Sequence, residues 1–270
     1  MRAVNRLWLG VAGLTVAVAV AGALTARADA RAEADENVRL LQRLTSLEQR
    51  MERQEAVHDI ENLTRAYGYY VDKQLWDQVY PLFTSDCRIE IAGRGVYLNA
   101  AGAKRLFLDS MGGGKVGLGP GMLFNHIILQ GVVNVSADGN TAKGRYRAVM
   151  QIGKAQAFAV VGEGTYENVY RKEDGIWKIS EMHFYSTYYT PYTDGWGKVN
   201  MPNNGPDQAA GPDLPQSVDY DVLPGHYVPP FHYPNPVTGK PWTLEDSRKY
   251  STHGMSPKPL VPGAQSAPSH

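Results

Sequence analysis

Apolar and polar positions follow helical spacing in the first part of the chain and strand-like alternation later. From His58 to Asp72, apolar or aromatic residues recur every three or four positions, which predicts an amphipathic helix. A second helix is expected over Tyr80–Asp86, followed by a strand over Cys87–Ile91, where the pattern changes to alternation. Polar residues that interrupt these apolar patterns are therefore the first candidates for chemistry.

A curved sheet is predicted for the middle of the chain. A short helix is expected over Asn99–Leu108, and the glycines of 111–121 predict a mobile loop or lid. Four segments rich in β-branched and aromatic residues follow, at 123–135, 141–152, 157–171 and 176–189. Turn-forming residues join successive segments. The order predicts an α+β fold in which a strongly curved antiparallel sheet wraps against helices and encloses a cavity.

The first 30 residues have the pattern of an export signal. Arg2 and Arg6 precede an uncharged apolar stretch from Leu7 to Leu24, and a small-x-small motif follows at Ala28–Ala30. The stretch is at the border of membrane-spanning length, so a cleaved signal peptide and an uncleaved N-terminal anchor both fit it. With either, we expect export, to the periplasm in a Gram-negative bacterium, with a tether to the inner membrane only if the segment stays uncleaved.

Composition divides the rest of the chain into three regions. Residues 31–57 are charged and helical in style, and 58–192 hold the predicted helices and strands. Residues 193–270 form an extension rich in Pro, Gly and Asn, whose aromatic residues favour wrapping over its own domain or an adjacent subunit. One apolar stripe in the first region fits a spacer helix and a short oligomerising coiled coil equally well: Leu40, Leu44, Leu47 and Met51.

Charge and motif content exclude several classes of function. Lys and Arg together number 27, as do Asp and Glu, so no electrostatic case exists for binding nucleic acid. The single Cys87 cannot form an internal disulfide and is expected as a buried strand residue. No two histidines have the spacing of a helical metal site, and no nucleotide-binding glycine motif is present. We therefore expect neither a metal nor an organic cofactor.

The order of these motifs resembles the SnoaL-like branch of the nuclear transport factor 2 superfamily, over about residues 58–190. The resemblance rests on the helix with Tyr67, Asp72 and Trp76, the LFTSD turn, the Asn125-His126 strand and the DGIWKI closing strand. It implies a cone-shaped α+β barrel with an apolar pocket, in a homodimer or homotrimer. The pattern is most similar to scytalone dehydratase and bile-acid 7α-dehydratase. The resemblance implies a reaction that needs neither a metal nor an organic cofactor.

Three residues are candidates for catalysis on the helix and the first long strand. His126 interrupts the apolar segment LFNHIIL, where it must find a partner or act on a ligand. Asp72 is its expected partner, because a carboxylate that holds an imidazole in one tautomer makes it a better base. The resemblance implies that Tyr67 polarises a substrate oxygen, although an ideal helix turns it about 140° from Asp72. A satisfied core histidine, a solvated carboxylate and a core tyrosine are the structural alternatives.

The remaining candidates lie on the strands and the second helix. By twofold alternation, His183 faces inward if Trp177 and Ile179 do, which makes it a fourth catalytic candidate. Candidate substrate-binding residues are Trp76, Phe124, Asn125, Tyr146, Met150 and Asn168. Met150 stands where the similar bile-acid dehydratase has a catalytic acid, and the basic residue of its last strand falls near Ser186. A pocket without that cation suits a neutral hydroxylated aromatic or polycyclic molecule.

These observations lead to hypotheses from different classes. The first is a cofactor-independent lyase in which an Asp72–His126 dyad eliminates water, or drives retro-aldol loss of formaldehyde. An isomerase or cyclase could use the same pocket. The second is a non-catalytic protein that binds hydrophobic small molecules, and the third is a membrane-tethered structural oligomer. The sequence does not identify the substrate.

Overall fold

The computed structural model describes residues 4–252 and 256–257, with the side chains of Leu24, Arg27 and residues 29–252. The chain divides into two compact units, residues 1–53 and 54–270. Helix α1 (Val4–Asp72) begins in the first unit and ends in the second. Each unit is described by itself.

The first unit consists of the N-terminal part of α1. Its stripe of Leu40, Leu44, Leu47 and Met51 is more than half exposed, so the spacer and the coiled coil both remain predictions. Within the described residues, no helix is long and apolar enough to cross a membrane. The apolar stretch expected to be a signal or anchor lies, apart from Leu24, outside the residues whose side chains are described.

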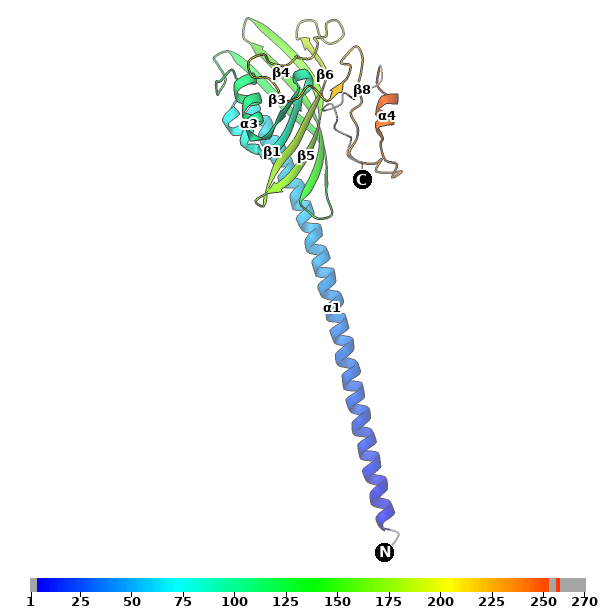
Figure 1. Cartoon of the computed structure of the whole chain (residues 1–270). Helices are drawn as coiled ribbons and strands as arrows, with labels where there is room; N and C mark the ends of the chain where they lie inside the picture. The colour runs from blue at the N-terminus through cyan, green and yellow to red at the C-terminus, as the bar shows by residue number, and fades with distance from the viewer. Residues whose placement is uncertain (1–3, 253–255, 258–270) are drawn as a thin grey trace. The chain divides into compact units, whose positions relative to one another are not determined.

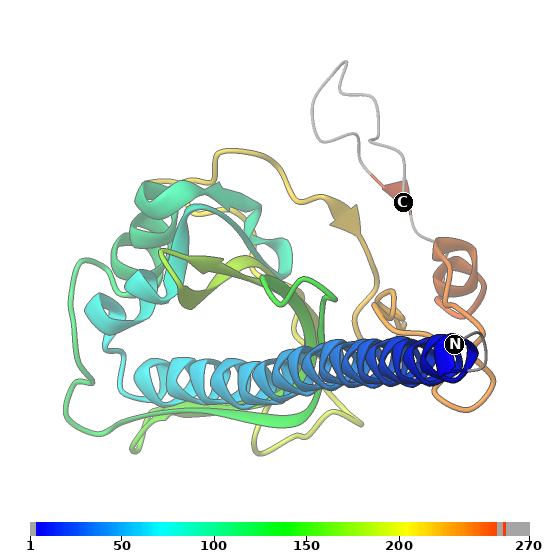
Figure 2. The same ribbon diagram turned by 90° about the horizontal axis from the view of Figure 1, so that it is seen from below.

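A six-stranded sheet forms the frame of the second unit, and Figure 1 and Figure 2 show it curving around the helices. Its strands are β1 (Phe83–Ile91), β2 (Val96–Leu98), β3 (Met122–Val135), β4 (Thr141–Lys154), β5 (Phe158–Glu173) and β6 (Ile176–Pro191). They lie in the order β2-β1-β6-β5-β4-β3, and β3 to β6 are joined as successive antiparallel neighbours. The four long strands predicted from β-branched and aromatic residues are thus present.

The sheet is mixed, whereas the sequence predicted an antiparallel one. Strand β1 runs parallel to β6, with Ile89 opposite Met182 and Ile91 opposite Phe184. The two strands are distant in sequence, so no short hairpin dictates their relative direction. Pairing with β6 also corrects the predicted helix over Tyr80–Asp86, because its last four residues begin β1.

Short helices connect β1 and β2 to the rest of the unit. They are α2 (Trp76–Val79), η1 (Tyr80–Leu82), η2 (Ala92–Arg94), α3 (Asn99–Lys104) and the π-helix η3 (Arg105–Met111). The C-terminal turns of α1 pack Ile60, Tyr67 and Val71 into the core, each at most 2% exposed. The apolar face predicted for this helix therefore covers the concave side of the sheet.

One irregularity in β6 decides which of its side chains face the core. Val169 of β5 pairs with Glu181, but the next residue, Tyr170, pairs with Ile179, so Ser180 is an extra residue in β6. A bulge of this kind reverses the alternation of sides along the strand. Ile179 faces inward before the bulge, and Phe184 faces inward after it.

The C-terminal extension packs on the outer face of the sheet. It includes β7 (Val218–Asp219), α4 (Leu244–Lys249) and β8 (Ser256–Pro257). Arg145 of β4 donates hydrogen bonds to the carbonyl oxygens of Pro229 and Pro230, and its guanidinium lies 4.0 Å from the ring centre of Phe231. His232 Nδ1 lies 2.9 Å from a carboxylate oxygen of Glu167 on β5. Polar and aromatic contacts thus hold the extension to its own domain.

Candidate active site

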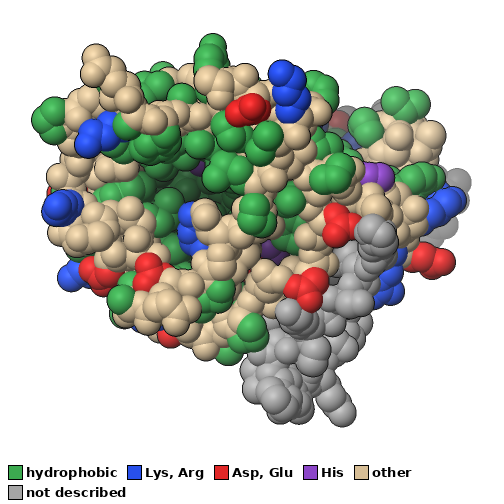
Figure 3. Space-filling model, turned by 90° about the horizontal axis from the view of Figure 1, so that it is seen from above, with side chains coloured by type: hydrophobic (Ala, Val, Ile, Leu, Met, Phe, Trp, Pro, Cys, Tyr) green, Lys and Arg blue, Asp and Glu red, His purple; other side chains and the backbone are tan. Residues whose placement is uncertain are grey.

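A cavity of about 370 Å³ lies between the concave face of the sheet, the end of α1, and η2 and η3. This volume is within the range of pockets that bind small molecules. Figure 3 shows a hollow with mainly hydrophobic walls on this side of the unit. The apolar side chains that line the cavity are Val71, Ile91, Met111, Phe124, Met150, Ile152 and Phe184.

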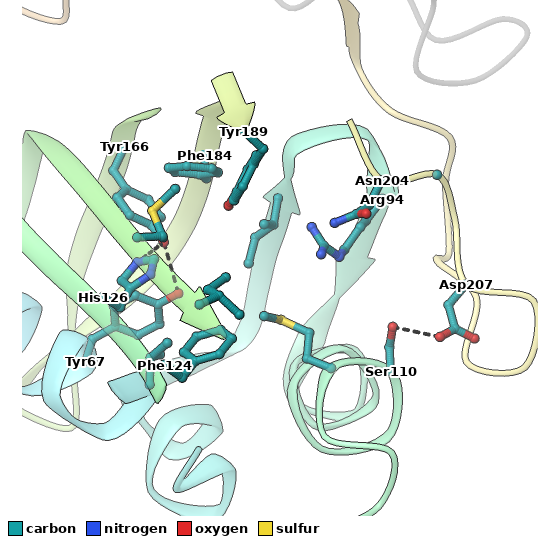
Figure 4. Close-up of a pocket in the computed structure, with 16 residues that line it drawn as sticks. Tyr67, Arg94, Ser110, Phe124, His126, Tyr166, Phe184, Tyr189, Asn204 and Asp207 are labelled. Carbon is teal, nitrogen blue, oxygen red and sulfur yellow. Dashed lines mark hydrogen bonds between the residues drawn. The ribbon is translucent and has the colours of Figure 1, made fainter. Parts of the chain in front are cut away.

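Three polar side chains from three elements meet at one end of this cavity (Figure 4). His126 Nε2 of β3 lies 2.8 Å from the hydroxyl oxygen of Tyr166 of β5. The Tyr166 hydroxyl lies 3.2 Å from that of Tyr67 of α1. We call these hydrogen-bonded residues the Tyr67–Tyr166–His126 relay. It is a continuous path along which protons can move.

Glycines on β5 make room for the aromatic wall beside the relay. A Cβ at Gly162 would lie 2.4 Å from the ring of Tyr189, and one at Gly164 would lie 2.3 Å from the ring of Phe184. Such separations are impossible for real side chains, so these positions require glycine. The rings of Tyr189 and Phe184 therefore cross β5 and close the cavity wall next to Tyr166.

Burial keeps every member of the relay uncharged at neutral pH. It lowers the pKa of His126 to about 4, and the side chain is only 8% exposed in total. Burial also raises the pKa of Tyr67 and the pKa of Tyr166 well above that of free tyrosine. The relay therefore offers a neutral imidazole and two intact hydroxyl groups to whatever occupies the cavity.

Asp72 contacts the backbone of His126, whereas the sequence predicted a contact with its ring. Its Oδ1 accepts a hydrogen bond from the His126 backbone N–H. No neighbouring strand pairs with this N–H, because β3 is an edge strand of the sheet. Gly68 permits the close approach, since a Cβ there would lie 3.0 Å from the His126 carbonyl oxygen. Asp72 thus fixes β3 against α1 and does not line the cavity.

His183 lies on the outer face of the sheet, which corrects the prediction that it faces the pocket. The bulge at Ser180 puts it on the side opposite Phe184. Its ring stacks on Tyr185 at a centroid distance of 3.8 Å, and its Nε2 lies 3.6 Å from a carboxylate oxygen of Glu90. Burial lowers the pKa of His183 to about 3. It is a half-buried structural histidine, packed against Tyr185.

Two of the predicted substrate-binding residues, Phe124 and Met150, line the cavity. Met150 is apolar at the place where the similar dehydratase has an acid, so this wall supplies no carboxylate. Trp76 lies behind the wall, stacked on Phe107 at 6.1 Å and edge-on to Phe124 at 6.2 Å. It supports the pocket without lining it.

The other three predicted binding residues lie elsewhere. Asn125 points to the outer face and donates a hydrogen bond to Gln151. Tyr146 and Asn168 are buried in the core and do not line the cavity. The Asn168 amide donates to the Tyr170 hydroxyl, which lies 2.8 Å from the hydroxyl of Thr64. We call Thr64, Tyr170 and Asn168 the sealed cluster.

Several lining residues were not among the sequence candidates. Tyr166 shares the inward alternation of β5, and that parity was the signal that could have found it. Arg94 lies in a short glycine-flanked turn, where sequence gives no direction for its side chain. Asn204 and Asp207 come from the C-terminal extension, and Ser110 donates a hydrogen bond of 3.0 Å to Asp207 at the rim. The extension therefore forms part of the cavity mouth.

No group of three or more His, Cys, Asp and Glu side chains that could hold a metal ion occurs in the part of the chain that the structure describes. The polar groups of the cavity are instead hydroxyls, one imidazole, one amide, one guanidinium and one carboxylate, contributed by the residues named above.

The fold and the site define an α+β domain whose curved sheet holds a mostly apolar cavity with a buried histidine. Residues 52–183 match the family model of the SnoaL-like domain. Over these residues the chain matches the SnoaL-like family that its motifs predicted.

Solved structures similar to this chain include two from Novosphingobium species. One is a protein of Novosphingobium aromaticivorans provisionally named a scytalone dehydratase, with 16% identity and a TM-score of 0.46, over 58% of this chain and 96% of that chain. Another is the hexachlorocyclohexane dehydrochlorinase LinA-type3 of Novosphingobium barchaimii, with 21% identity and a TM-score of 0.44, over 52% and 92% of the respective chains. No curated protein sequence gives a match.

Proposed function

We propose that the domain is a cofactor-independent acid-base lyase that removes water from a hydroxylated, largely apolar small molecule. The observation that supports this proposal is the Tyr67–Tyr166–His126 relay, a continuous hydrogen-bonded path at one end of an apolar cavity. Elimination of water needs a base at a carbon and an acid at the neighbouring hydroxyl. The relay has a proton acceptor at one end and a proton donor at the other.

The roles follow from the tautomer of His126 that carries its proton on Nε2. In that arrangement Nε2–H donates to Tyr166, Tyr166 donates to Tyr67, and Tyr67 donates to the hydroxyl of the substrate. This leaves Nδ1 of His126 unprotonated, and among the described residues nothing donates a hydrogen bond to it. Nδ1 is therefore the base.

The reaction follows as one transfer around the relay. Nδ1 of His126 removes the proton from a substrate carbon that a neighbouring carbonyl or aromatic ring has acidified. The electron pair of that C–H bond forms the new double bond, and the C–O bond breaks. Tyr67 protonates the departing hydroxyl, Tyr166 reprotonates Tyr67, and Nε2 reprotonates Tyr166. Water leaves, and exchange with solvent restores the first tautomer.

This route fits the electrostatics of the cavity. A base that simply kept the proton would become an imidazolium, which burial disfavours, as the lowered pKa of His126 indicates. In the relay, one nitrogen gains a proton as the other gives one away, so the ring stays neutral throughout. The hydroxyl groups of Tyr67 and Tyr166 also return to their starting state.

The test is turnover by the full chain on a panel of hydroxylated aromatic and polycyclic compounds, followed by mass spectrometry for loss of water. Replacing His126 with Ala should lower kcat/KM by about 10³-fold or more, because it removes the base and breaks the relay. His183→Ala is the control, since that histidine is also packed in the domain but faces away from the cavity.

If His126→Ala keeps its turnover, the assignment of His126 as the base is wrong, provided that circular dichroism shows both variants folded. Equal losses in the two histidine variants would trace the effect to stability and also remove the proposal. Binding of panel compounds without any conversion by the wild-type protein would replace it with a carrier function.

A further inference from the structure

Arg94 is the only Lys or Arg among the residues that line the cavity. It ends η2, the turn between β1 and β2, and Figure 4 shows its guanidinium pointing into the cavity from the side opposite His126. The backbone around it has left-handed conformations, with φ of 52° at Ala92 and 89° at Gly95. These angles aim the side chain inward from the end of a strand.

Among the described residues, the guanidinium of Arg94 forms no ion pair within 4.0 Å, whereas Arg145 and Arg147 each pair with a glutamate. Asp207 is the one carboxylate among the residues that line the cavity, and it is already engaged by Ser110 and by two backbone N–H groups. Arg94 is half-buried, so its donors are open to the cavity and available to a ligand there.

The turn that carries Arg94 is held in place by the C-terminal extension. A Cβ at Gly93 would lie 2.6 Å from the carbonyl oxygen of Asn204, and one at Gly95 would lie 2.6 Å from the ring of Pro212. The turn therefore packs tightly beneath the extension. The charge also reaches the relay, because Arg94 opposes the rise in pKa that burial causes at Tyr67 and Tyr166.

We infer that the substrate carries a carboxylate that Arg94 binds, with the reacting carbon and hydroxyl at the relay across the cavity. The inference deepens the proposed function and rests on it for the position of the reacting group. The guanidinium of Arg94 carries a fixed charge and lies across the cavity from His126. It therefore suits a permanent anion on the substrate better than an anion that develops at the reacting carbon. The planar fork of a guanidinium matches the two oxygens of a carboxylate.

This inference changes the substrate class. The sequence favoured a neutral molecule, because the position expected for a cation on the last strand is near Ser186. The structure supplies the cation from another element, the turn after β1. The substrate is then an aromatic or polycyclic hydroxy acid, whose apolar body contacts Phe124, Met150 and Phe184.

The experiment compares binding of 2-naphthoate and 2-naphthamide, which share a ring and differ in charge, by isothermal titration calorimetry at neutral pH. Wild-type protein should bind the acid about tenfold more tightly or better, the range expected of hydrogen bonds to a charged group. Arg94→Gln should remove this preference, and Arg94→Lys should keep part of it. Arg171→Gln, which loses only a surface ion pair with Asp86, should leave it unchanged.

Equal binding of acid and amide by the wild-type protein overturns the inference, as does an unchanged preference in Arg94→Gln. His126→Ala separates this inference from the proposed function. That variant should keep the preference for the acid while losing turnover. If His126→Ala loses turnover but the wild type does not prefer the acid, the lyase stands and the carboxylate is ruled out. If the wild type prefers the acid but His126→Ala keeps its turnover, the carboxylate stands and the lyase is ruled out.

Discussion

Two hydrogen-bonded clusters of similar composition lie side by side in this domain, and only one of them borders the cavity. The relay and the sealed cluster both draw on α1 and β5: Thr64 and Tyr67 lie three residues apart on the helix, and Tyr166 and Tyr170 lie four apart on the strand. Tyr166 and Tyr170 are each at most 2% exposed. A buried hydroxyl network is therefore not in itself a site.

The difference between the clusters is access and chemistry. Every member of the sealed cluster has a protein partner, and none of them lines the cavity. The relay ends instead at a cavity and includes the imidazole of His126, which can accept a proton at one ring nitrogen and give one from the other. Three predictions would break or sharpen this contrast.

The largest effect is expected from removing the central hydroxyl of the relay. Tyr166→Phe keeps the ring but interrupts the path between His126 and Tyr67, and should lower kcat by about 10³-fold, equivalent to about 4 kcal/mol. Tyr170→Phe makes the same chemical change in the sealed cluster and should lower only the unfolding free energy, by about 1 kcal/mol. Steady-state kinetics measures kcat, and urea unfolding measures the free energy of unfolding. Similar losses of kcat in both variants would erase the distinction.

The second prediction uses pH. Of the two clusters, only the relay contains a group, His126, whose pKa in the acid range differs between the folded and unfolded states. The folded pKa of His126, about 4, is below the unfolded value of 6.5. Burial of the neutral ring therefore adds stability above pH 6.5, and this is lost as pH falls through 4. The difference between the two pKa values corresponds to about 3 kcal/mol.

Urea unfolding at pH 7 and pH 4 measures this contribution of His126 to the free energy of unfolding. Between these values, wild-type protein should lose about 2 to 3 kcal/mol more unfolding free energy than His126→Gln, which lacks the titrating ring. His183 is present in both proteins, so its own titration cancels in the comparison. In the wild type, kcat should stay level down to about pH 5. A fall of kcat centred near pH 6.5 would contradict the burial of His126.

The smallest effect is expected at Asp72, which holds the strand of the relay but not its ring. Asp72→Asn retains an oxygen that can accept the His126 backbone N–H, so kcat should change by less than about tenfold and stability by under about 1 kcal/mol. Asp72→Ala should cost about 1 to 2 kcal/mol of unfolding free energy. A loss of kcat of about 10³-fold in Asp72→Asn would restore the dyad predicted from sequence.

Local periodicity accounts for what the sequence predicted well. Four residues singled out from sequence line the cavity: Tyr67 on the predicted helix, and Phe124, His126 and Met150 on predicted strands. Such positions depend mainly on the period of the element that contains them. The resemblance to the SnoaL-like family added the order of the elements.

The features that sequence could not reveal depend on contacts between distant segments. The extra residue at Ser180 exists only relative to its partner β5, and it moved His183 to the outer face. The acceptor role of Asp72 depends on β3 being an edge strand. Arg94 enters the cavity because the turn that carries it packs beneath a segment more than 100 residues later in the chain, at Asn204 and Pro212.

The C-terminal extension also sets when the cavity can first work during synthesis. Its mouth includes Asn204 and Asp207, and the face behind it is covered by Phe231 and His232, all of which follow the last strand of the sheet. A chain that has emerged from the ribosome only as far as β6 has its relay residues but neither the rim nor the support of the turn that carries Arg94. A complete cavity is therefore among the last features that the nascent chain acquires.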